Sequence, residues 1–64
     1  MEEIFANLEN EEVEIRLKAL DELIKKVNEL DKNQVINALK PHILDWDDSV
    51  REKVSYVLSL YTGL

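Results

Sequence analysis

The side chains best suited to acid–base or metal chemistry lie close together, at His42, Asp45, Asp47 and Asp48. One imidazole beside carboxylates on a turn lacks the second histidine or third fixed ligand of a catalytic zinc site. The segment also lacks the glycine and the closing glutamate of a calcium-binding loop. Aspartates just before a helix commonly accept hydrogen bonds from its first free amides. We therefore interpret these side chains as helix caps and expect no metal site.

Nucleophilic catalysis is also not indicated. The chain contains no cysteine, and Ser49, Ser55 and Ser59 lie in no sequence context that would activate a hydroxyl. We therefore expect a protein that is not an enzyme, with no catalytic residues and no cofactors.

The composition indicates a single small folded domain. The chain has 64 residues, of which 45% are hydrophobic and 34% are charged, with one glycine and one proline. A domain of this size buries only about 60% of the surface of its unfolded chain, so its core is marginal. Because no disulfide can form, additional stability must come from idealised packing or from self-association, and we favour self-association.

The charge of the chain restricts its partners. The formal net charge is −6, which disfavours binding to nucleic-acid backbones and to anionic membrane surfaces. No apolar run approaches the ~18 residues of a membrane span, and the first residues, Met-Glu-Glu, lack the basic start of a signal peptide. The sequence therefore favours a cytoplasmic protein without a membrane partner.

A long amphipathic helix over 11–29 is the strongest structural signal. At about 100° per residue its apolar side chains cover roughly 200° of the circumference, whereas a helix with one buried side shows an apolar stripe a little over ~100° wide. Such a helix must pack against neighbours on two sides. Three further helices are predicted over 2–8, 33–45 and 49–61.

Capping and breaking residues set the expected helix ends. Asn10 and Asp31 are predicted N-caps of the second and third helices, and Gly63 is placed to end the fourth. Pro41 removes the amide that would bond to Asn37, which predicts a kink in the third helix rather than two separate helices.

The fourth helix also carries an apolar arc about 200° wide, and no later segment follows to cover its second side. Tyr56, Leu60 and Leu64 lie on or beside this side. Aromatic and apolar groups next to polar rims are typical anchors of protein interfaces. They predict a protein-interaction site, and we expect a homodimer joined through this helix; packing within the monomer is the alternative.

The chain repeats itself after 35 residues. Matching pairs in this register are Ile4/Leu39, Leu8/Ile43, Glu12/Asp47, Ile15/Val50, Arg16/Arg51, Ala19/Val54 and Leu23/Leu58. The pattern predicts an all-α domain of two stacked antiparallel helical hairpins, with repeat-like halves 1–30 and 31–64. A period of this length is typical of helical solenoid units, which bury their apolar faces by stacking.

Residues 47–51, Asp-Asp-Ser-Val-Arg, followed by Val54, Leu58 and Tyr61, resemble the loop and second helix of a HEAT repeat. Pro41 corresponds to the proline that bends the first helix of such a repeat, and the first half of the chain resembles a degenerate second copy. The resemblance implies a scaffold that binds other proteins. It also implies that an aspartate and an arginine bridge adjacent repeats, which assigns structural bridging to Asp47 and Arg51.

Arg16 lies inside the apolar arc of its own helix. A buried guanidinium without a partner would be very costly, so we expect it to reach a carboxylate or free carbonyl groups at the turn of the next hairpin. Asp47 is the first candidate.

Nucleic-acid binding is the alternative function, because two-helix units can also place a helix in a groove. The basic side chains are scattered among acids and do not form the continuous basic surface that such proteins carry. They are Arg16, Lys18, Lys25, Lys26, Lys32, Lys40, Arg51 and Lys53.

Overall fold

The structure is a computed structural model that describes residues 2–63, with side chains from Glu3 onward. Its elements are α1 (Glu2–Leu8), α2 (Val13–Lys25), α3 (Lys32–Leu39), a short 3-10 helix η1 (Lys40–His42) and α4 (Asp48–Thr62). No strand occurs in the described part. The predicted all-α fold with four helices is confirmed.

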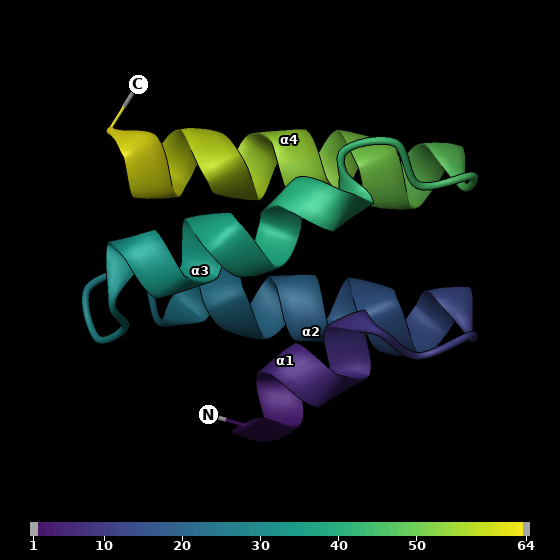
Figure 1. The fold of residues 1–64 in the computed structure, drawn as a ribbon, viewed down its shortest axis with the longest axis horizontal. Helices are drawn as coiled ribbons and strands as arrows, with labels where there is room; N and C mark the ends of the chain where they lie inside the picture. Colours follow the sequence, from purple (N-terminus) through teal and green to yellow (C-terminus); the bar gives the residue numbers. More distant parts are fainter. Residues whose placement is uncertain (1, 64) are drawn as a thin grey trace.

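The helices form two hairpins that lie side by side. The first hairpin consists of α1 and α2, which pack together, and the second consists of α3, η1 and α4. The long helices α2 and α4 pack against each other and run in the same direction, as Figure 1 shows. This arrangement agrees with the predicted pair of stacked hairpins.

The two long helices begin in the register that the sequence repeat predicts. Glu12 is the N-cap of α2, and Asp47, 35 residues later, is the N-cap of α4. The Asp47 carboxylate accepts a hydrogen bond of 3.0 Å from the Val50 amide. The prediction of Asn10 as the N-cap of this helix was wrong: its side chain accepts a bond of 2.8 Å from the amide of Glu12, two residues later, and Glu12 itself holds the N-cap position.

Two of the expected helices are shorter than predicted. α2 ends at Lys25 rather than 29, because the chain turns at Lys26 to bring Leu30, 8% exposed, into the core. The third helix does not continue to 45 with a kink. Since Pro41 cannot donate an amide hydrogen bond, α3 ends at Leu39 and passes directly into η1.

A shared core joins the hairpins. Its fully buried side chains come from all four α-helices and include Leu8, Leu20, Leu23, Val35, Leu39, Val50, Val54, Val57 and Tyr61. The Tyr61 hydroxyl donates a hydrogen bond of 2.6 Å to the carbonyl of Leu23, in the last turn of α2. Carbonyl groups there have no amide partner within the helix, so this bond ties the end of α4 to the end of α2.

No described helix combines the length and the apolar character needed to cross a bilayer.

Candidate functional site

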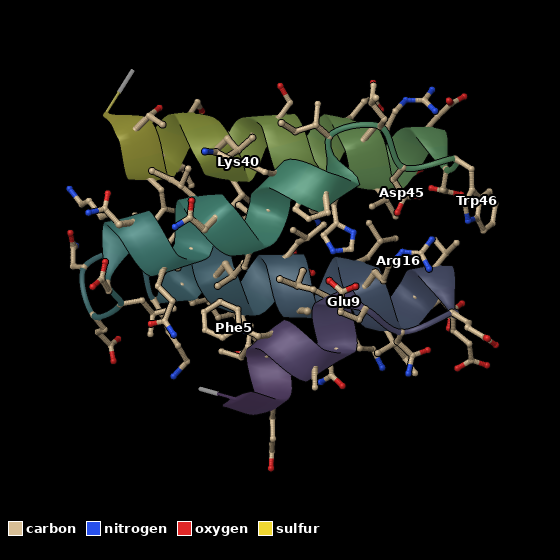
Figure 2. The ribbon with its side chains drawn as sticks, viewed as in Figure 1. Phe5, Glu9, Arg16, Lys40, Asp45 and Trp46 are labelled. Carbon is tan, nitrogen blue, oxygen red and sulfur yellow. The ribbon has the colours of Figure 1, made fainter. Side chains whose placement is uncertain are left out.

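The two hairpins are locked together by a buried ion pair between Arg16 of α2 and Asp45, which lies in the turn before α4. Arg16 Nε lies 3.1 Å from Asp45 Oδ2, and Nη2 donates a hydrogen bond of 3.3 Å to Oδ1. Both side chains are more than nine-tenths buried. Figure 2 shows them pointing toward each other across the space between the hairpins. We call this pair the hairpin junction.

Each side chain of the hairpin junction also hydrogen-bonds to the backbone of the turn in its own hairpin. Arg16 Nη1 donates to the carbonyl groups of Asn10 and Glu11, at 2.7 and 3.0 Å, and the Asp45 carboxylate accepts a bond of 2.9 Å from the Asp47 amide. Each buried charge therefore has both an opposite charge and hydrogen-bond partners, which a buried ion needs in order to be tolerated.

Asp45, and not Asp47, is the carboxylate that Arg16 reaches. The prediction of Asp47 as its first candidate partner was wrong, because Asp47 is committed to capping α4 through Val50. The position of Asp45 depends on the irregular turn that follows η1. The helical periodicity of the sequence cannot predict the geometry of such a turn.

Trp46 lies beside the hairpin junction, with its ring centroid 5.5 Å from the Arg16 guanidinium carbon. This distance suits a cation–π interaction. The indole is nevertheless 73% exposed, so most of its surface remains open to solvent (Figure 2).

Arg51, the second predicted bridging arginine, contacts only its own hairpin among the described residues. Its Nη1 donates a bond of 2.8 Å to the Asp45 carbonyl, and its Nη2 pairs with the carboxylate of Asp48, one turn earlier on α4. A bridging role for Arg51 therefore remains a prediction.

His42 is the one histidine, and it is nearly buried. Its Nε2 lies 2.7 Å from a carboxylate oxygen of Glu9, which is a second polar contact between the hairpins. Nδ1 lies 4.0 Å from Asp45 Oδ2. Within the described residues no group of three or more histidine, aspartate or glutamate side chains is arranged to hold a metal ion.

Among the residues that the structure describes, the large hydrophobic side chains that are exposed all belong to the second hairpin. They are Ile43, Leu44, Trp46 and Tyr56, with exposed fractions of 47, 88, 73 and 54%. At helical spacing, Ile43 and Trp46 would share one face with Val35 and Leu39 if the third helix continued. Because the regular helix stops before Pro41, both lie in or after a turn instead; the proline was the signal that could have indicated this.

The predicted interaction residues of α4 lie on one flank of that helix. Tyr56 is exposed, Leu60 is partly buried, and Leu64 lies outside the described residues. By helical periodicity this flank of α4 faces away from α3. On the side toward α2, its surface is continuous with that of α2. Partly buried α2 side chains extend it: Val13, Leu17 and Ile24. We call this surface the α2/α4 face.

An ion pair crosses the α2/α4 face. Lys53 Nζ of α4 lies 2.6 Å from Asp21 Oδ1 of α2, and both groups are partly exposed. The face thus combines apolar side chains with one acid and one base.

A groove lies at each open end of the hairpin pair. The groove of the first hairpin has a volume of about 410 Å³ and a mainly charged or amide lining, formed by Glu3, Ile4, Asn7, Lys18, Ala19, Glu22 and Lys26. The groove of the second hairpin, about 380 Å³, has an apolar centre and is lined by Ile43, Arg51, Glu52, Val54, Ser55 and Leu58. We call the latter the C-terminal groove.

Comparison of the chain with models of known protein families, with curated proteins and with solved structures finds no match.

Proposed function

We propose that this protein is a non-enzymatic interaction module, a HEAT-like pair of hairpins that self-associates through the α2/α4 face. The observation that supports this is the side chain of Tyr56, 54% exposed, on a face whose other apolar side chains are only partly buried: Leu60 of α4 and Val13, Leu17 and Ile24 of α2. Exposed apolar surface on a small soluble chain usually marks a site of interaction.

The α2/α4 face is complementary to itself. In a two-fold dimer the same surface of each copy meets its equivalent, so each residue needs a partner that the same surface supplies. Asp21 of one copy can pair with Lys53 of the other, and the reverse, while Tyr56 packs on the apolar row of α2. Tyrosine is among the side chains most often found as energetic anchors of interfaces.

The size of the molecule also favours a broad face. A stable interface buries about 800 Å² on each partner. The described chain exposes 4359 Å², so a dimer would cover about a fifth of it. Two parallel helices side by side offer an area of this order, whereas a single turn or loop does not.

Light scattering over a dilution series, with thermal unfolding of the same samples, tests the proposal. We expect the mass to rise toward twice the 7.5 kDa of the chain with increasing concentration, and the melting temperature to rise with it. Tyr56→Glu should abolish both trends, because it places a charge at the centre of the apolar contact. The helical circular dichroism should be retained, since Tyr56 is half exposed.

Ser55→Glu is the matched control. It introduces the same charge one position earlier on α4, on the flank that faces away from α2. It should leave self-association unchanged. A mass of one chain at every concentration, or loss of association in Ser55→Glu but not in Tyr56→Glu, would contradict the proposal.

A further inference from the structure

The turn before α4 displays two large apolar side chains to solvent. Leu44 is 88% and Trp46 is 73% exposed, and they flank Asp45, whose own side chain points into the hairpin junction. Neither belongs to the hydrophobic core or lines the C-terminal groove. The fold therefore does not use them as core residues, and tryptophan is among the side chains most often found as anchors of interfaces.

One face of the Trp46 ring is available to a second cation. The Arg16 guanidinium carbon lies over the ring, 5.5 Å from its centroid, and the exposure of the indole leaves the opposite face in solvent. The charge of Arg16 is balanced by Asp45, at 3.1 Å, so it repels a further cation only weakly. Lysine and arginine side chains bind to open tryptophan faces of this kind.

Carboxylates from both hairpins surround the indole. Arg16 Nη1 donates a bond of 3.0 Å to the Glu11 carbonyl, which places the turn of the first hairpin next to Trp46. Glu11 and Glu12 of this turn are exposed, and Asp47 follows Trp46 in the chain. Within residues 3–63 none of these three carboxylates takes part in an ion pair.

The net field at this end of the molecule is negative. The helices α2 and α4 run in the same direction and both begin here, and each helix start contributes about half a positive charge. The three unpaired carboxylates outweigh this contribution. The other charges nearby cancel, because Asp48 is paired with Arg51 and Asp45 with Arg16.

We infer that Leu44, Trp46 and the carboxylates of Glu11, Glu12 and Asp47, together the Trp46 tip, bind a lysine- and arginine-rich segment of a partner protein. One of its cations stacks on the open face of the indole, and others lie beside the carboxylates. Opposite charges steer such partners together and exclude partners of the same sign. A second copy of this chain, with its net charge of −6, has the wrong sign.

A labelled basic peptide provides the probe. We choose repeated Arg-Leu-Lys-Gly units, with a control peptide in which glutamate replaces both basic residues, and measure binding by fluorescence anisotropy. The basic peptide should bind, more weakly as salt is added, and the acidic peptide should not. Because Trp46 is the one tryptophan of the chain and the peptides contain none, a change in its emission on binding locates the contact.

Matched variants separate the Trp46 tip from the overall charge of the chain. Trp46→Ala should weaken binding by about tenfold, the effect of losing an interface anchor. Glu11→Gln with Glu12→Gln should weaken it several-fold and reduce its dependence on salt; neither side chain caps α2, so the fold should be retained. Glu22→Gln with Glu29→Gln removes the same charge at the opposite end of α2 and should leave the affinity unchanged.

Three results would overturn the inference: no binding of the basic peptide, full affinity in Trp46→Ala, or equal losses in the two pairs of glutamine variants. Phosphatidylcholine vesicles that change the Trp46 emission, where the peptide does not, would assign the tip to a lipid surface and also overturn it. The proposed self-association is tested separately, because Tyr56→Glu should abolish it and leave binding of the peptide unchanged.

Discussion

The turns of the two hairpins, residues 9–12 and 43–47, occupy equivalent positions in the repeat but have different contacts. In the first turn the Asn10 side chain accepts one local amide, and its carbonyl accepts Arg16. Asp45 makes both equivalent contacts, to the Asp47 amide and from Arg51, and also receives the buried Arg16 of the other hairpin. The two turns thus differ because position 10 carries an amide, which bonds only within its own turn, whereas position 45 carries a carboxylate, which also pairs with Arg16 of the other hairpin.

The largest loss of stability is expected when the carboxylate that distinguishes the second turn from the first is removed. Asp45→Asn makes the second turn resemble the first and leaves the Arg16 guanidinium buried without an opposite charge. We expect a loss of about 3 kcal/mol in the free energy of unfolding, measured by urea denaturation. Asn10→Ala, at the equivalent position of the first turn, should cost about 1 kcal/mol or less, the value of an exposed hydrogen bond.

A double variant checks the cause. Arg16→Ala with Asp45→Ala should be less destabilised than the sum of the single changes, because each single change leaves a buried charge alone. Equal losses for Asp45→Asn and Asn10→Ala would show that the two turns are energetically equivalent and that the hairpin junction has no special role.

A smaller loss of unfolding free energy than that of Asp45→Asn is expected when Tyr61 of α4 is changed, and almost none when Tyr56 is changed. Tyr61→Phe removes the hydrogen bond from its hydroxyl to Leu23, leaves that carbonyl buried without a partner, and should cost about 1–2 kcal/mol. Tyr56→Phe should change the unfolding free energy of the monomer by less than ~0.5 kcal/mol, since its ring is half exposed. Similar losses in both variants would contradict this assignment.

Tyr61 should also make the stability of the fold depend on pH in alkaline solution. Burial, together with the nearby negative charge of Glu29, raises the pKa of Tyr61 above its ordinary value of 10.0. In alkaline solution the unfolded chain therefore loses its phenolic proton before the folded chain does. This contribution to stability is complete below pH 10 and is lost as the pH rises through the folded-state pKa.

Urea unfolding between pH 9 and 11, the interval around the ordinary tyrosine pKa of about 10, measures this loss. The difference between the wild type and Tyr61→Phe isolates the contribution of this hydroxyl. Parallel alkaline curves for the two proteins would show that Tyr61 titrates alike in the folded and unfolded states.

Trp46 should contribute less than Tyr61. Its ring lies over Arg16, but most of the indole is in solvent, so Trp46→Ala should cost about 0.5–1 kcal/mol. In an Arg16→Ala background the loss should shrink, because the cation is gone. An unchanged loss there would mean that the indole stabilises the fold by packing alone.

The smallest effect is expected at the ion pair that crosses the α2/α4 face. Lys53 and Asp21 are partly exposed, so Lys53→Met should change the stability of the monomer by less than about 1 kcal/mol. The change should become smaller in 1 M salt, where the screening length of about 3 Å is close to the 2.6 Å between the two groups. Thermal unfolding of dilute samples at two salt concentrations measures it.

The parts of the structure that depend on local chemistry were predictable. The carboxylate of Asp31 accepts the amides of Asn33 and Gln34 as expected of an N-cap, and Gly63 ends α4 with a left-handed φ of 79°. The burial of Arg16 and its need for an inter-hairpin partner followed from its place in an apolar arc. These features require only the residues of one helix and its ends.

The features that were missed depend on how the chain turns between elements. The choice of Asp45 over Asp47 and the end of α3 at Leu39 rather than 45 both result from the irregular course of the chain around and after Pro41. The early end of α2 results from burying Leu30 against the other hairpin. Each of these is decided by packing between the hairpins, which the periodicity of a single helix does not report.

The central claim is that copies of the protein meet through the α2/α4 face, with Tyr56 at its centre, and not through the groove of the first hairpin. NMR relaxation caused by a soluble paramagnetic compound, recorded at low and high protein concentration, tests it residue by residue. We expect Tyr56 and Leu60 to be accessible in dilute samples and to become protected on concentration, while Asn7 and Glu22 of the first hairpin stay accessible. Protection that develops at Asn7 and Glu22, with Tyr56 accessible throughout, would contradict the claim.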